Sequence, residues 1–146
     1  WCCDLRILGE GSIFGQPEVL LGIIPGGGAT QRLTRLVGRP TAKRLIWGGA
    51  QVEAVEALAL GMADEVVGDT EILNRACELA ATYATGPRLA IRAAKQAIDE
   101  GVDMPLGEGI DLELDLFLKV FDSDDAKRGV ESFFEHGPGK AHFTGA

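Results

Sequence analysis

Glycine and proline are unevenly placed along this chain, and this constrains its fold more than any other feature. Residues 4–28 contain short apolar runs broken by glycine, and the last of them, Val19–Ile24, leads into Pro25-Gly26-Gly27-Gly28. Runs of this length bounded by turn residues are typical of buried strands or tight loops. We therefore expect strands at Leu5–Leu8 and at Ile13-Phe14, followed by a chain with the spacing of helices.

Later glycines coincide with the ends of the expected helices. A helix that starts near residue 29 should stop before Gly38, because glycine is common just past a helix end. A second helix is expected over Thr41–Trp47, with its threonine as the cap. Val52–Leu60 has the composition of a third helix, and Ala63–Val67 is short enough to be a last strand.

Beyond this point nearly the whole pattern is helical. Asp69-Thr70 can cap one helix, Pro87 suits the first position of the next, and Ser123 can begin a last short helix. Residues 110–121 alternate apolar and polar side chains like a strand, but they also satisfy helical spacing. We predict a helix there. Its apolar side chains would lie on nearly every face, so one face needs a partner chain.

Composition and charge exclude several classes of protein. The 146 residues include 14 Lys and Arg against 22 Asp and Glu, a formal net charge of −8. Such an acidic chain has no general attraction for nucleic acid or anionic lipid, and no apolar run is long enough to span a bilayer.

Cysteine and histidine usage points to a compartment and argues against a metal site. Unpaired cysteines fit a reducing, cytoplasmic compartment, and no cysteine lies near either histidine, so no metal site is expected. The chain opens Trp1-Cys2-Cys3-Asp4 without an initiator methionine, which suggests a fragment or a processed chain.

Glu18 is the only carboxylate between Gly11 and Gly38, and its neighbours are apolar. A carboxyl that loses hydration favours its protonated form, which suits it to donate and accept protons near neutrality. The alternative is a structural carboxylate that bonds backbone amides near a turn, and local composition alone favours this alternative.

The three consecutive glycines that precede the first helix also have two interpretations. Gly26 and Gly28 fit the first two positions of the Gly-x-Gly-x-x-Gly dinucleotide fingerprint, but the third position falls on Gln31. No Gly-Lys-Ser/Thr follows, which excludes a P-loop. What remains is a loop that lets the backbone approach a ligand closely, or simply a tight strand-to-helix turn.

The order of these motifs resembles that of a known family. Phe14-Gly15-Gln16-Pro17-Glu18, followed by Pro25 to Leu33 and Val37-Gly38, closely resembles the enoyl-CoA hydratase/isomerase (crotonase) family. The resemblance continues through Gly61 to Val67 and through the tail from Gly129 to Phe143, so it covers essentially the whole chain.

The resemblance implies an α/β fold in which part of the family's ββα spiral precedes an α-helical C-terminal trimerisation region. Residues 1–68 would form the C-terminal part of the crotonase core and residues 69–146 the helical region, so the chain would be the C-terminal portion only. The assembly expected for such an enzyme at full length is a homotrimer or a dimer of trimers.

The resemblance also implies a reaction, the addition of water to an α,β-unsaturated acyl-CoA thioester. Coenzyme A is part of this substrate, so no separate cofactor is expected. Glu18 matches the glutamate that exchanges a proton with Cα of the thioester. The family's oxyanion-hole amides, most of its coenzyme A contacts and its second glutamate precede the part that this chain resembles. The chain alone is therefore expected to be inactive.

Four further positions carry over from the resemblance as substrate-binding residues. Pro17 and Gly26 belong to the matched motifs, and Phe121 occupies a position like that of an aromatic residue that, together with a lysine, a neighbouring subunit places against the coenzyme A nucleotide. The family's lysine for this nucleotide falls on His136, and Lys140 is displaced beyond it. Two alternatives remain open: an enoyl-CoA isomerase or other thioester-enolate enzyme of the family, and a non-catalytic oligomerisation fragment.

Overall fold

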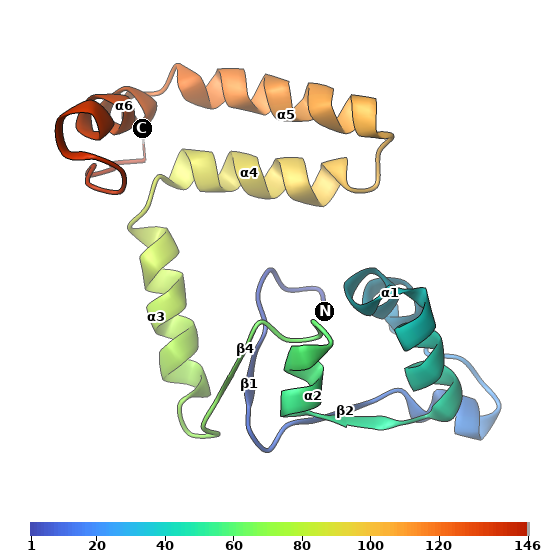
Figure 1. Cartoon of the computed structure of the whole chain (residues 1–146). Helices are drawn as coiled ribbons and strands as arrows, with labels where there is room; N and C mark the ends of the chain where they lie inside the picture. Colours follow the sequence, from blue (N-terminus) through green and yellow to red (C-terminus); the bar gives the residue numbers. More distant parts are fainter. Residues whose placement is uncertain (146) are drawn as a thin grey trace. The chain divides into compact units, whose positions relative to one another are not determined.

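The computed structural model describes residues 1–145, and the chain divides into two compact units, Trp1–Cys77 and Glu78–Ala146. Each unit is described by itself (Figure 1). The boundary between them lies within helix α3 (Ile72–Ala84). The domain division predicted at residue 68 concerns the family's core and helical regions, and it stays a prediction.

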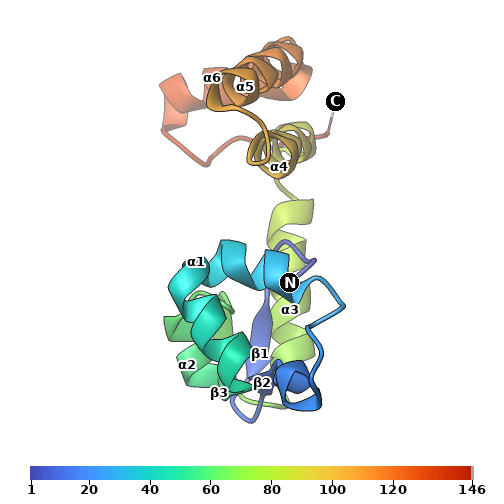
Figure 2. The same ribbon diagram turned by 90° about the vertical axis from the view of Figure 1, so that its right-hand side faces the viewer.

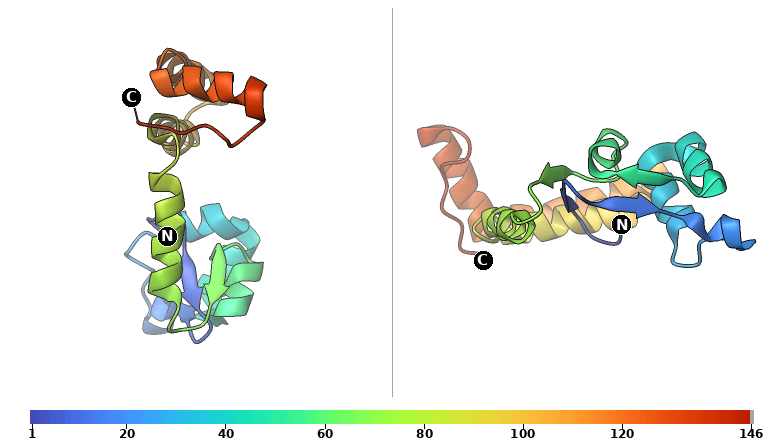
Figure 3. Two further views of the ribbon diagram at one scale, coloured as in Figure 1. Left: turned by 90° about the vertical axis from the view of Figure 1, so that its left-hand side faces the viewer. Right: turned by 90° about the horizontal axis from the view of Figure 1, so that it is seen from below.

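The first unit contains two separate pairs of short strands. Strand β1 (Ile7–Gly9) pairs in parallel with β4 (Glu65–Val67), and β2 (Ile13–Gly15) pairs antiparallel with β3 (Gln51–Glu53), side by side as in Figure 3. These strands and the helices around them confirm the prediction of a mixed α/β protein, which is mostly helical with short strands.

Arg6 sets where β1 begins. Its backbone N–H donates to Asp64 Oδ2 at 2.7 Å, and its guanidinium donates to Asp64 Oδ1 at 3.1 Å and to the Met62 carbonyl at 3.0 Å. These bonds tie the chain before β1 to the turn before β4. The strand predicted at Leu5–Leu8 therefore starts two residues later, at Ile7.

The helix predicted over Val52–Leu60 is wrong at its start. Val52 lies in β3 opposite Phe14 and is only 2% exposed, and helix α2 covers Ala54–Ala59. A β-branched side chain that packs against a cross-strand aromatic stabilises a strand at this point, although the residues that follow favour a helix.

Helix α1 (Ala29–Gly48) is not straight (Figure 2), and its change of direction lies at Gly38. Gly38 has φ 76° and ψ 161°, which is not a helical conformation, so the predicted stop before this residue is confirmed. Thr41 was expected to cap the second segment but lies inside it. Pro40 precedes it in the first turn, where its fixed φ is compatible with a helix start.

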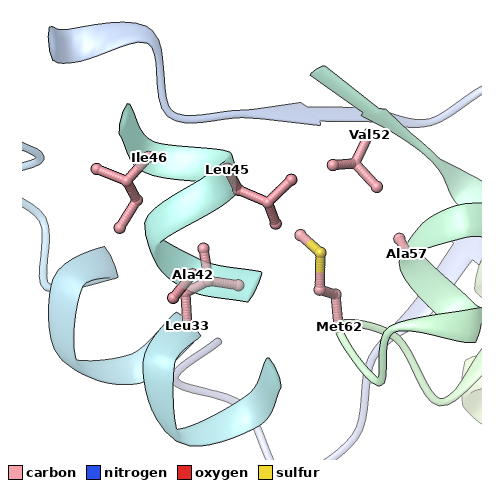
Figure 4. Close-up of a cluster of buried hydrophobic side chains, with 7 residues drawn as sticks. All are labelled: Leu33, Ala42, Leu45, Ile46, Val52, Ala57 and Met62. Atoms are coloured by element: carbon pink, nitrogen blue, oxygen red, sulfur yellow. The ribbon is translucent and has the colours of Figure 1, made fainter. Parts of the chain in front are cut away.

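A compact apolar core joins both segments of α1 to β3 and α2. Met62 extends from the turn after α2 towards Leu45 of α1 and Val52 of β3 (Figure 4). Partly buried side chains around this core include Phe14 of β2 and Val19, which comes from the loop region before α1. The buried residues of the core cluster are Leu33, Ala42, Leu45, Ile46, Val52, Ala57 and Met62.

The second unit is helical. Helices α4 (Arg88–Gly101) and α5 (Leu106–Phe121) lie side by side as a hairpin, and α6 (Asp124–His136) follows. The helix predicted over residues 110–121 is thereby confirmed. Its side chains Leu114, Phe117 and Phe121 are each more than half exposed within the described residues.

Two of the three predicted helix starts beyond residue 68 are confirmed. Pro87 directly precedes α4, and the Ser123 side chain accepts a hydrogen bond from the Ala126 N–H at 3.1 Å at the start of α6. Asp69 does not cap α3, because its carboxylate accepts the Gly11 N–H at 2.9 Å and so joins the β1–β2 turn to the start of α3.

Candidate active site

Glu18 lies in a one-turn 3-10 helix, η1 (Pro17–Leu21), between β2 and α1. Pro17 occupies the first turn, where its missing N–H has no cost. Gly22, at φ 77°, ends the turn and donates its N–H to the Val19 carbonyl at 3.0 Å, while the Ile23 N–H donates to the Glu18 carbonyl at 3.2 Å. The two amides that end this turn, those of Gly22 and Ile23, are therefore used by main-chain oxygens.

Of the two structures predicted for Val19–Ile24, the tight loop is confirmed and the buried strand is wrong. Val19 packs against the core, but Leu20, Leu21 and Ile24 are 70%, 78% and 72% exposed. A single 3-10 turn followed by a glycine directs only part of the run towards the core. Leu20 Cγ lies 2.9 Å from the place of a Cβ at Gly49, at the end of α1, but most of the Leu20 side chain stays exposed.

The carboxylate of Glu18 is the chemically notable group of this unit. Its Oε2 atom is buried and has no hydrogen-bond partner, and it is the only buried side-chain nitrogen or oxygen in this state among residues 1–145. An unpaired buried polar atom costs on the order of 1–3 kcal/mol, so such atoms are rare without a functional reason. The turn does not satisfy this oxygen, and the role of Glu18 stays a prediction.

The glycine loop leads from η1 into α1. Gly28 has φ 92°, and its carbonyl accepts the N–H groups of Gln31 at 3.1 Å and Arg32 at 2.9 Å. The Arg32 guanidinium lies where a side chain at Gly28 would stand. A Cβ at Gly26 would meet no atom within 4 Å, so the backbone there is open to a ligand. Its role in substrate binding stays a prediction.

Phe121 and Lys140 belong to the second unit, whereas Glu18, Pro17 and Gly26 belong to the first. Phe121 ends α5, is 55% exposed and lies 5.4 Å from the ring of Phe117. Lys140 is exposed and lines a depression of about 280 Å³ beside α6. Both side chains are accessible within their own unit.

The sequence analysis missed Asp125, the one buried charged residue among residues 1–145. The hydrogen bond from the Thr144 N–H, above all, holds the pKa of Asp125 below its usual value of 3.8. The only sequence signal is an aspartate in the first turn of a Ser-capped helix, which is common on exposed helices. Its burial depends on a residue 19 positions later.

Residues 1–145 contain neither a metal-binding cluster nor a membrane-spanning helix. Within that range, no three His, Cys, Asp or Glu side chains are grouped so that they could hold a metal ion. No helix there combines the length and apolar character needed to cross a bilayer.

The sequence of this chain is similar to a protein-family model and to named relatives. The family model described as "Enoyl-CoA hydratase/isomerase" matches residues 1–146. A short-chain-enoyl-CoA hydratase of Clostridioides difficile is 44% identical over 131 residues, which cover 90% of this chain and 84% of that protein. "Probable enoyl-CoA hydratase 2, mitochondrial" of Arabidopsis thaliana is 42% identical over 133 residues, 91% of this chain and 44% of its own length.

Solved structures agree with the sequence relatives. The crystal structure of an enoyl-CoA hydratase from Bacillus anthracis superposes with a TM-score of 0.90 at 35% identity, over 99% of this chain and 55% of that one. This chain thus spans about half the length of most relatives it matches. The family match over residues 1–146 does not support the prediction that only a C-terminal portion is present. On the family model and the relative covered to 84%, the chain belongs to the enoyl-CoA hydratase/isomerase family.

Proposed function

We propose that this chain supplies Glu18 as a proton-transferring carboxylate of an enoyl-CoA hydratase-type enzyme. The observation that carries the proposal is the buried Oε2 of Glu18, which no group of the turn satisfies. Relatives at about 40% identity are named as enoyl-CoA hydratases, which supports the same reaction. The substrate is an α,β-unsaturated acyl-CoA thioester.

In this reaction the oxygen of water bonds to Cβ of the enoyl thioester and a proton is added at Cα. Protonated Glu18 gives its proton to Cα and becomes a carboxylate. The water molecule loses one proton to a second base and keeps the other as the new hydroxyl group on Cβ. Charge that develops on the thioester oxygen needs amide donors placed to receive it. By the family resemblance, these donors and the second glutamate have no counterpart in residues 1–146.

The remaining assignments follow the same proposal. Pro17 and Gly26 would line the thioester end of the substrate, whereas Phe121 and Lys140 would contact the nucleotide of a substrate bound by a neighbouring subunit. The enzyme would assemble as a homotrimer or a dimer of trimers and act in the cytoplasm. The names of two relatives, from Arabidopsis thaliana and Dictyostelium discoideum, include the word mitochondrial, which makes the compartment a point to test directly.

Two alternative functions have an observation in their favour. An isomerase or other thioester-enolate enzyme would use Glu18 to move a proton at Cα without adding water, and one relative is named "Enoyl-CoA isomerase/hydratase fer4". A non-catalytic oligomerisation fragment would instead use the exposed apolar side chains of α5, such as Leu114 and Phe117.

The test is Glu18→Gln in an active enzyme that contains this sequence, with crotonyl-CoA as substrate. The amide keeps the size of the side chain but removes the transferable proton, so kcat should fall by about 100-fold or more. KM should change far less, because the lost interaction belongs to the transition state. Exchange of the substrate α-proton with deuterated solvent should fall together with kcat.

Glu10→Gln is a charge-matched control, because Glu10 is an exposed carboxylate in the turn after β1. It should leave kcat unchanged. A Glu18→Gln enzyme with near-normal kcat, or with no defect except a lower melting temperature, would make Glu18 a structural carboxylate. Double-bond migration without net hydration, in an enzyme that still requires Glu18, would favour the isomerase.

A further inference from the structure

The chain after α6 turns back along that helix. Gly137, at φ 84°, ends α6 and donates its N–H to the Phe133 carbonyl at 3.0 Å. We call residues 137–145 the C-terminal strap. Phe143 of the strap lies against Gly129 of α6, with a ring carbon 3.5 Å from the place of a Cβ. The strap therefore runs from the end of α6 back to its beginning.

One buried carboxylate holds the far end of the strap. Asp125, 3% exposed in the first turn of α6, accepts the Thr144 N–H at 2.8 Å and the Thr144 hydroxyl at 3.2 Å on Oδ1. Its Oδ2 accepts the Gly145 N–H at 2.7 Å. Hydrogen bonds to an ionised acceptor are about twice as strong as neutral ones. Three of them converge on this single side chain.

Two arginines complete the attachment of Thr144. Arg128 Nη1 donates to the Thr144 hydroxyl oxygen at 2.8 Å and lies 3.9 Å from Asp125 Oδ1. Arg88 of α4 donates from Nη2 to the Thr144 carbonyl at 2.9 Å. Every polar group of Thr144 is thereby bonded, and the neighbouring Arg128 cation also favours the ionised form of Asp125.

The closed strap forms one wall of the depression of about 280 Å³ beside α6. Arg128, Glu135 and His136 line it from the helix, whereas Lys140 and His142 line it from the strap. If the strap detached from Asp125, Lys140 and His142 would leave this wall. Which side chains line the depression therefore depends on Asp125, although Asp125 does not line it.

We propose that Asp125 is a positioning residue, which keeps the C-terminal strap closed and so holds Lys140 beside α6 to bind the phosphate-bearing end of acyl-CoA. This inference rests on the proposed function, because it assigns Lys140 to the substrate. Asp125 itself touches no substrate, and it acts only through the strap.

The first test measures strap closure in the 146-residue chain. Asp125→Asn keeps the side-chain size but loses the charge and places an NH₂ group towards N–H donors. Amide exchange at Thr144 and Gly145 and trypsin cleavage after Lys140 should both become at least 10-fold faster. Asp124→Asn is the matched control, because the Asp124 carboxylate is next to Asp125 in the sequence but is 65% exposed and pairs with Lys127. In this variant the amide exchange and the trypsin cleavage should keep their wild-type rates. Equal exchange and cleavage rates in the two variants would overturn the role of Asp125 in holding the strap closed.

The second test separates positioning from general stability by measuring the affinity for coenzyme A by titration calorimetry in an active enzyme that contains this sequence. Asp125→Asn and Lys140→Ala should weaken binding to a similar extent, about 5-fold or more. The double variant should be no weaker than Lys140→Ala alone, because Asp125 acts through Lys140. Additive losses, or an opened strap with unchanged affinity, overturn the positioning role.

The outcomes also distinguish this inference from the proposed function. If the Lys140→Ala enzyme binds coenzyme A as tightly as the unchanged enzyme, the assignment of Lys140 is overturned and with it the role of Asp125. That result does not bear on strap closure by Asp125 or on the Glu18→Gln prediction. A normal kcat for Glu18→Gln with the predicted coenzyme A coupling would instead refute the catalytic proposal alone.

Discussion

Replacement of Gly38 by alanine should weaken the first unit through the backbone alone. Gly38 joins the two segments of α1 at φ 76° and ψ 161°, a region that is essentially restricted to glycine. The space around it is open, since the nearest atom to an added Cβ is Pro40 Cδ at 4.0 Å. A clash therefore contributes nothing, and the whole effect comes from the conformation.

The magnitude follows from two opposing terms. Holding a non-glycine residue in this region costs about 1–3 kcal/mol. The alanine also restricts the unfolded chain, which returns about 0.4–1 kcal/mol. We expect the free energy of unfolding to fall by about 1–2 kcal/mol. Relaxing the strain by straightening α1 would pull Leu33 away from Leu45 in the core, which prevents an easy escape.

Gly48→Ala is the matched control in the same helix. Gly48 has no positive φ, lies in the last turn of α1 and would place its Cβ in open space. Alanine there should leave stability unchanged or raise it by up to about 1 kcal/mol, because it favours the helix. The two variants add the same methyl group, so their difference isolates the backbone conformation.

Urea denaturation followed by tryptophan fluorescence measures this effect. Both tryptophans of the chain, Trp1 and Trp47, lie in the first unit, so the signal reports that unit and not the helical one. The midpoint should fall for Gly38→Ala and stay or rise for Gly48→Ala, with equal slopes. Equal midpoints for the two variants would refute the argument that the kink requires glycine.

Three further predictions concern the chain as it stands. The chain alone should not hydrate crotonyl-CoA, since losing even one oxyanion donor costs about 100–1000-fold; turnover within tenfold of a full-length relative would contradict this. The exposed side chains of α5 should make the chain self-associate at tens of micromolar, and a sharp monomer peak in light scattering would argue against it. The lowered pKa of Asp125 means that the strap keeps its ionic stabilisation above pH 3.8 and loses it as the pH falls through that lowered value. The Thr144 amide should exchange more slowly in the wild type than in Asp125→Asn until the pH falls below 3.8 to the lowered pKa of Asp125. If this difference in exchange rate disappears near pH 6, a group other than Asp125 is responsible.

Much of the helical part could be predicted because its signals are local. Pro87 and Ser123 act within one turn of the helices they begin, and the stop at Gly38 depends on that residue's own φ and ψ. The segment at 110–121 was ambiguous by spacing, but it has no strand partner among the described residues and folds as α5.

The errors occur where a distant partner overrides local preference. Val52 joins a strand because Phe14 lies opposite, and Asp69 bonds the Gly11 N–H, 58 residues earlier, instead of capping α3. The run Val19–Ile24 has the composition of a buried segment, yet within the first unit only Val19 reaches the core. Local composition contains no information about these partners.

For the candidate site, the sequence by itself determined the carboxylate and its motif, because Glu18 is the single acid in an apolar, glycine-bounded stretch. Only the tertiary structure decided that its Oε2 is buried and unpaired, and that Asp125 holds the strap. The physical reason is the same in both cases. Whether a polar atom is satisfied depends on every donor that the folded chain brings near it, and those donors are set by packing and not by sequence neighbours.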